Sequence, residues 1–225
     1  MKTGKRSVFG VFVFLFLGMI SFVSPVFGSD PIGAALDLAV REPENMTAQA
    51  ALARAYNLNG EPGKAYSAAR SVLQRSAEHA AALLELGHAA RMLGKYEESA
   101  EYYRRYLASH PLSLEALAGN SENFAMLGLW SESLAAAMTA VRIAPERPEG
   151  YGALGRVYRI GGRFDEAIDV LQQGLKIEKD RAALLFDLGM CFAEQGNRGA
   201  AFEIYKQLVP LDRRLAGILF ESVRP

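Results

Sequence analysis

A period of 34 residues runs through most of the chain, and this repeat constrains the fold more than any other feature. Glycine recurs at that spacing in five places: Gly60, Gly94, Gly128, Gly162 and Gly196. Other positions keep the same period, because the seventh residue of each unit is leucine, apart from Asn120, and the eighth is always small. The units in this frame are 46–79, 80–113, 114–147, 148–181 and 182–215. The chain therefore contains five copies of one structural unit.

Each unit predicts two helices joined by a tight turn. Two stretches with helical apolar periodicity flank the glycine, for example 81–92 and 97–108 around Gly94. Glycine can close the first helix in a left-handed conformation that other residues avoid. Small residues at the eighth and twentieth positions of the unit allow its two helices to approach closely. We therefore expect an all-α protein in which every unit is a helix-turn-helix.

This pattern resembles the tetratricopeptide repeat (TPR) family, whose 34-residue unit carries Leu-Gly, a following aromatic residue, a mid-unit Ala and a late Pro. The best copies are residues 83–111 and 151–175, and the resemblance covers about 170 residues of the chain. It implies a right-handed α-solenoid of five tandem units with capping helices. Residues 29–45 are expected to form an amino-terminal capping helix, and 216–225 a carboxy-terminal tail or cap. An apolar helix over 215–223 would either face a partner or fold back on the fifth unit.

Two side chains of the third unit stand out from their columns. Asn120, next to Ser121, replaces a leucine that is expected to be buried. Such a polar pair indicates either a soft layer of the array or drift accommodated by hydrogen bonds, and we favour the second interpretation. Trp130 occupies the position of Tyr96 and Phe164 in other units, so we expect it in the core.

Residues 1–28 have the features of a signal peptide or signal anchor. They contain three basic residues and no acidic one, and the basic residues precede an apolar run over 8–23. Small residues before Ser29 favour cleavage there, whereas 8–27 is also long enough to span a membrane as a retained helix. In both cases the positive-inside rule places the remainder outside the cytoplasm, and we expect a periplasmic protein. No cysteine stands directly after the apolar run, so we do not expect a lipoprotein anchored through an amino-terminal Cys.

Composition and motifs argue against several function classes. Lys plus Arg equals Asp plus Glu, at 25 each, so the chain lacks the positive excess typical of nucleic-acid binding. Cys191 is the single cysteine, cannot form an intramolecular disulfide, and is expected to be buried and inert. No nucleophile elbow, phosphate-binding glycine loop or zinc-protease helix is present in the sequence. We therefore expect a protein that is not an enzyme and that holds no cofactor. His88 with Glu85 and Glu122 is too weak a pattern to predict a metal site.

The family resemblance implies that the first helix of each unit lines a concave groove that binds a protein or peptide. The partner-binding residues expected there are Arg54, Leu84, His88, Arg91, Met92, Glu122, Met126, Arg156, Arg159 and Met190. The carboxylate clamp of the chaperone-binding members is absent, because its positions here hold Ala50, Arg54, Glu85, Glu115 and Gly119. Two roles remain open for Arg91, Arg156 and Arg159: they bind an acidic peptide or polymer, or they pair across the groove with Glu122, Glu149 and Glu194.

The function predicted from these observations is a non-catalytic scaffold for protein interactions in the cell envelope. Its combination of an export signal and an unbroken array is similar to repeat proteins that assist the assembly of pili, secretion channels or exopolysaccharide machines. The alternative is a membrane-anchored structural or oligomerisation subunit that retains its amino-terminal helix. In both cases only that segment is expected to touch the membrane, and a homo-oligomer is left open.

Overall fold

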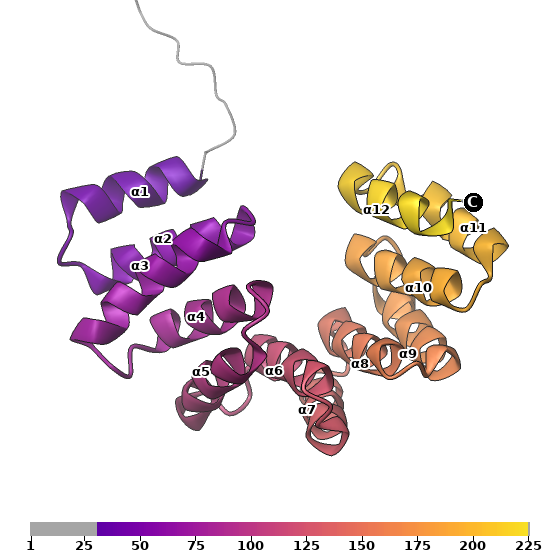
Figure 1. The fold of residues 1–225 in the computed structure, drawn as a ribbon, viewed down its shortest axis with the longest axis horizontal. Helices are drawn as coiled ribbons and strands as arrows, with labels where there is room; N and C mark the ends of the chain where they lie inside the picture. The colour runs from indigo at the N-terminus through magenta and orange to yellow at the C-terminus, as the bar shows by residue number, and fades with distance from the viewer. Residues whose placement is uncertain (1–30, 225) are drawn as a thin grey trace, which may run out of the picture. The chain divides into compact units, whose positions relative to one another are not determined.

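The computed structural model describes residues 31–224, and it confirms the predicted all-α solenoid (Figure 1). Every regular element in this range is a helix: α1 (Pro31–Arg41), α2 (Met46–Leu58), α3 (Pro62–Arg75), α4 (Ala80–Met92), α5 (Tyr96–Ser109), α6 (Leu114–Met126), α7 (Trp130–Ile143), α8 (Pro148–Ile160), α9 (Phe164–Ile177), α10 (Ala182–Glu194), α11 (Arg198–Leu208) and α12 (Arg213–Val223). The predicted signal peptide or anchor over 1–28 lies outside the described residues. Within the described range, no helix combines the length and apolar character needed to cross a membrane.

The five periodic glycines close the first helix of each unit as expected. All five have positive φ, between 71° and 80°, which is the left-handed region that favours glycine. At Gly94 the backbone N–H donates to the carbonyl of Arg91 at 3.0 Å, and the N–H of Lys95 donates to that of Ala90 at 2.9 Å. These bonds satisfy carbonyls that the helix end would otherwise leave without partners, so each turn is short and the second helix starts at once.

The helices form two layers. The first helices of the units, α2, α4, α6, α8 and α10, are called A helices here, and the second helices, α3, α5, α7, α9 and α11, are called B helices. Each A helix contacts the A helix of the next unit, whereas each B helix contacts the A helix before it and the helix that follows it. Between residues 31 and 224 the backbones of the B helices are not adjacent to one another, although side chains connect them, as in the hydrogen bond from the Tyr66 hydroxyl of α3 to Glu98 of α5. The A helices therefore make one continuous surface, the A-helix face.

Tyr103 of α5 lies where two A helices leave space for it. Its side chain is fully buried between Gly87 of α4 and Gly119 of α6. A Cβ atom at Gly87 would lie 2.5 Å from the Tyr103 ring, and one at Gly119 would lie 2.6 Å from its hydroxyl oxygen. Because both positions are glycine, the ring passes through the A layer and brings its hydroxyl to the A-helix face.

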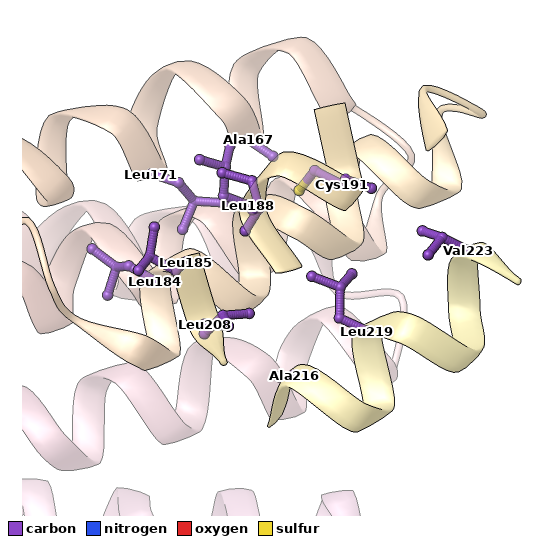
Figure 2. Close-up of a cluster of buried hydrophobic side chains, with 12 residues drawn as sticks. Ala167, Leu171, Leu184, Leu185, Leu188, Cys191, Leu208, Ala216, Leu219 and Val223 are labelled. Atoms are coloured by element: carbon purple, nitrogen blue, oxygen red, sulfur yellow. The ribbon is translucent and has the colours of Figure 1, made fainter. Parts of the chain in front are cut away.

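The carboxy-terminal helix folds back on the fifth unit. Helix α12 contacts α10 and α11, and Ala216, Leu219 and Val223 are buried there. Figure 2 shows Leu219 and Val223 projecting from α12 toward the apolar cluster that includes Cys191. Burial raises the pKa of the Cys191 thiol to about 12, so the thiol stays protonated. Helix α12 therefore covers the end of the array. Of the two predicted alternatives, the structure shows the helix folded back on the fifth unit and not a helix that faces a partner.

The third unit has a polar core. Asn120 is 6% exposed, and its side-chain oxygen has no protein partner. The amide of buried Asn123 donates to the Ser99 hydroxyl at 2.8 Å, and the Ser133 hydroxyl donates to the Ser121 carbonyl at 2.8 Å. Hydrogen bonds thus satisfy part of this layer but not the Asn120 oxygen, against the interpretation we favoured.

The expectation that Trp130 is a core residue is wrong. Its side chain is 44% exposed, and its ring lies 3.4 Å from where a Cβ atom of Gly161 would stand. Glycine at that position in the next unit leaves the ring without a side chain to cover it. The position in the repeat therefore did not determine burial here.

Candidate functional site

Four charged side chains form a chain of ion pairs across the A-helix face. Arg91 Nη1 of α4 lies 2.9 Å from Glu122 Oε2 of α6, and Arg156 Nε of α8 lies 2.7 Å from Glu122 Oε1. Arg156 Nη1 also lies 2.8 Å from Asp187 Oδ2 of α10. Glu122 and Arg156 hold the same position in successive units, and such positions on neighbouring A helices lie beside one another. Arg91 and Asp187 are displaced from that position by three residues, about one helical turn, in opposite directions along their helices. We call Arg91, Glu122, Arg156 and Asp187 the ion ladder.

Burial makes the ladder electrostatically strong. The side chains of Glu122 and Asp187 are 15% and 6% exposed, respectively. Burial opposes ionisation of Glu122, but the guanidinium groups of Arg156 and Arg91 outweigh it and lower the pKa of that carboxyl. Burial raises the pKa of Asp187, and Arg156 offsets only part of that effect. The pKa of Arg156 is raised although its burial acts against the charge, because both acids favour its protonated form.

A second set of polar contacts adjoins the ladder and depends on Tyr103. The Tyr103 hydroxyl lies 2.9 Å from His88 Nδ1, and His88 Nε2 lies 2.9 Å from Glu115 Oε1 of α6. The hydrogen bond from His88 lowers the pKa of Glu115 despite its partial burial. Tyr103 thus fixes the orientation of an A-face histidine from the opposite layer.

The third groove arginine is also paired. Arg159 Nη1 lies 2.6 Å from Glu194 Oε1 of α10. The structure therefore shows the pairing alternative for Arg91, Arg156 and Arg159, with two of the acids that the sequence suggested, Glu122 and Glu194. Glu149, the remaining acid, instead contacts Arg147 and Arg181.

Three residues of the ladder, Arg91, Glu122 and Arg156, line a cavity of about 360 Å³. Its lining comes from α4, α6, α8, α10 and the residues just before α8 and α10: His88, Arg91, Leu114, Glu115, Ala118, Gly119, Glu122, Arg147, Glu149, Gly152, Arg156, Arg181, Ala183 and Leu184. The cavity exists because the fifth position of the unit is small in α6 and α8, as Ala118 and Gly152, whereas α4 and α10 carry Leu84 and Phe186 there. We call this space the central cavity.

The structure brings together four of the ten predicted site residues in the central cavity: His88, Arg91, Glu122 and Arg156. Arg54 and Leu84 line a separate hollow of about 440 Å³ between α2 and α4, although Leu84 is itself buried at 8% exposure. Arg159 lies outside both spaces.

The three predicted methionines do not share an environment. Met92 and Met126 are exposed, at 45% and 48%, and line neither hollow. Met190 packs against the carboxy-terminal core cluster. The adaptable apolar contacts expected from methionine in the groove are therefore offered by Met92 and Met126.

Sequence reasoning missed Arg147, Arg181 and Tyr103. The two arginines stand at the residue before an A helix, which in earlier units is Asn45, His79 or Ser113. A change in that column from acceptor side chains to arginine was the available signal. Tyr103 could have been found only by noticing that Gly87 and Gly119 flank it in space. Within residues 31–224, no group of His, Cys, Asp and Glu side chains has the arrangement of a metal site.

Comparisons with known proteins agree with the repeat fold. The sequence profile of the tetratricopeptide repeat matches residues 51–113, and a related profile described as TPR repeat matches 155–196. Comparison with curated protein sequences gives no significant match.

Solved structures of low sequence identity share the fold. A tetratricopeptide repeat protein from Parabacteroides merdae superposes with a TM-score of 0.74 at 18% identity, covering 86% of this chain and 77% of the other. A thermophilic TPR protein of Thermus thermophilus gives 0.67 at 19% identity, covering 85% and 98%. PilW, described as a widely conserved type IV pilus biogenesis factor, gives 0.65 at 21% identity, covering 83% and 88%.

Proposed function

Because this chain belongs to the tetratricopeptide repeat family, we propose that it is a non-catalytic scaffold that binds a protein or peptide partner on its A-helix face. The observation that carries the proposal is the central cavity, which opens on the surface where four A helices meet. Arginine, histidine and carboxylate side chains line it beside Leu114 and Leu184. A peptide can match both the charged and the apolar groups of this lining, whereas a purely apolar ligand would leave the charged groups without partners.

We further propose that the protein acts in the cell envelope, as an assembly or accessory factor of an envelope complex. The support is the basic and then apolar character of residues 1–28. The fold shared with a pilus biogenesis factor makes pilus assembly the first candidate, with secretion and exopolysaccharide systems next. This assignment to a complex rests on analogy of fold and leader together.

Site-specific photo-crosslinking in cells tests the binding face. A photoreactive residue replaces Met126 on α6 in one variant and Met138 on α7 in a control variant. The two methionines are matched, because both are exposed, at 48% and 57%, and they differ in the layer that they occupy. We expect a partner to be captured from Met126 and not from Met138. Adducts from Met138 alone would place the binding surface on the B helices.

The same experiment addresses the alternative function, a membrane-anchored structural subunit. Adducts of the chain with itself from both positions would support that alternative. Determination of the amino-terminal residue on purified protein separates the two further. Ser29 at the terminus indicates a cleaved signal, whereas a retained leader in the membrane fraction supports the anchor.

A further inference from the structure

The central cavity carries two kinds of arginine. Arg91 and Arg156 lie in the ion ladder, with contacts of 2.7 to 2.9 Å to their acids. Arg147 and Arg181 stand at the mouth, and both contact a single oxygen of Glu149 at 3.3 Å. Arg181 also pairs with exposed Glu178, at 3.4 Å. Charge-assisted hydrogen bonds are typically about 2.7–2.9 Å long, so the mouth arginines are loosely held and the ladder arginines are not.

The residue before each of the two helices beside these arginines provides no capping acceptor. Asn45, His79 and Ser113 cap α2, α4 and α6 by accepting hydrogen bonds from first-turn N–H groups. Arg147 and Arg181 hold the equivalent positions before α8 and α10, and neither caps its helix. Arginine has five donors and no acceptor, so it cannot do so. An anion at the mouth would meet two guanidinium groups and the positive end of a helix dipole.

The lining sets the charge of the ligand. Four guanidinium groups face three carboxylates, those of Glu115, Glu122 and Glu149. Within the ladder, Arg91 and Arg156 are balanced by Glu122 and Asp187, whereas Arg147 and Arg181 share Glu149 alone among the lining acids. The formal excess at the mouth is therefore one positive charge, and it suits one carboxylate. A polyanion or a doubly charged phosphate would meet repulsion from the three acids. Leu114 and Leu184 in the same lining offer contact for an aliphatic stem.

We propose that the central cavity binds a side-chain carboxylate from an acidic segment of a protein partner, and that Arg147 and Arg181 are the residues that contact it. This inference rests on the proposed function, because it names the chemistry of the partner at the same face. Planar guanidinium groups recognise carboxylates in a fork geometry that lysine cannot reproduce. Glu149 occupies part of the site in the free protein and competes with the incoming group.

The test uses the full chain and an array of matched synthetic peptides, in which every glutamate-containing sequence has a glutamine counterpart. The double variant Arg147→Gln with Arg181→Gln removes the mouth charges. The matched control, Arg104→Gln with Arg142→Gln, removes two arginines from the B helices α5 and α7. Melting midpoints and far-UV circular dichroism establish that each variant is folded before binding is compared.

We expect the wild type to prefer glutamate peptides and to bind them at least about tenfold more tightly than the mouth variant, because both guanidinium donors to the carboxylate are removed. The control variant should bind as the wild type does. Glu149→Gln should bind about threefold more tightly, because a competing like charge is gone. This gain of binding keeps the test decisive even where the double variant fails to fold.

Four results would overturn the inference. Equal binding of glutamate and glutamine peptides by the wild type would show that no carboxylate is recognised. Absence of peptide binding would do the same, and tighter binding of heparin or inorganic phosphate than of any peptide would identify a polyanion site instead. A partner captured from Met126 that binds the mouth variant undiminished would also reject the carboxylate site, while the scaffold function would stand.

Discussion

Neutralising the two acids of the ion ladder should change stability in different directions. Glu122→Gln and Asp187→Asn are both isosteric, and both acids contact the same Arg156. The carboxylate of Glu122 accepts from two guanidinium groups, and its lowered pKa means that its ionised form favours the folded state. Burial raises the pKa of Asp187, so its ionised form disfavours the folded state relative to its protonated form.

The magnitude for Glu122→Gln follows from its two contacts. A hydrogen bond to a charged group contributes about 1.5–3 kcal/mol. The substituted amide keeps one acceptor oxygen and turns a donor toward the other guanidinium group. Because the side chains of Arg91 and Arg156 are 31% and 27% exposed, water replaces part of the loss, and we expect a net cost of about 2 kcal/mol. With an unfolding entropy of about 2.1 cal/mol/K per residue over about 190 residues, the midpoint falls by about 5 °C. Asp187→Asn should leave the midpoint unchanged or higher.

The pH dependence supplies the check on this reasoning. The folded pKa of Glu122 lies below its ordinary value of 4.5, so its stabilisation is complete above that value and is lost as pH falls through the folded pKa. The difference between wild type and Glu122→Gln should therefore be full near neutral pH and shrink in acid. Thermal melts followed by circular dichroism at neutral and at acidic pH measure this difference in stability. A loss for Asp187→Asn as large as that for Glu122→Gln, or a difference that persists in acid, would refute the argument.

Four further variants or treatments probe single features. Gly128→Val should destabilise by more than about 1 kcal/mol in a melt, because valine must take the positive φ of 74° there, and Gly63→Ala, with open space around it, is the tolerated control. Gly87→Ala should cost about 1–3 kcal/mol in the same assay, since its Cβ would collide with the Tyr103 ring, and an unchanged midpoint would show that the ring moves freely. Cys191 should react with a thiol reagent only after denaturant is added, and fast labelling of the folded chain would contradict its burial. Arg181→Ser should raise stability by about 1 kcal/mol by capping α10 and should weaken binding of glutamate peptides; a lower midpoint would show that Arg181 already stabilises the helix end.

The turns of this fold were predictable because each imposes a backbone requirement on one residue. A positive φ strongly favours glycine, and the five turns therefore carry glycine at a fixed spacing in the sequence. The helices between them followed from apolar periodicity. Burial of a given side chain was less predictable, because it depends on the size of a neighbour in another unit. Trp130 shows this: its column is aromatic elsewhere, yet Gly161 of the next unit leaves it partly uncovered.

The sequence predicted which charged residues lie on the face of the candidate site, but not which of them contact one another. The repeat placed Arg91, Arg156 and Arg159 on one face, but spacing along one helix does not determine distances to the next. Whether these arginines pair within the protein or are free for a ligand was therefore open, and the structure shows them paired. The role of Tyr103 was still harder to predict from the sequence. This B-helix residue reaches the A-helix face because Gly87 and Gly119 on two different A helices both lack side chains.

Two irregularities of the repeat coincide in space, and their coincidence is what gives the central cavity a chemical character. Small residues at Ala118 and Gly152 open the hollow, and the capping column changes to arginine at Arg147 and Arg181 beside it. Each helix without a capping side chain gives up about 1 kcal/mol of stability. Among the A helices, α2, α4 and α6 retain acceptor caps, and α8 and α10 beside the hollow lack them and carry loosely held donors instead. That exchange separates a binding site from a gap in packing, because a gap in packing requires no change in the caps.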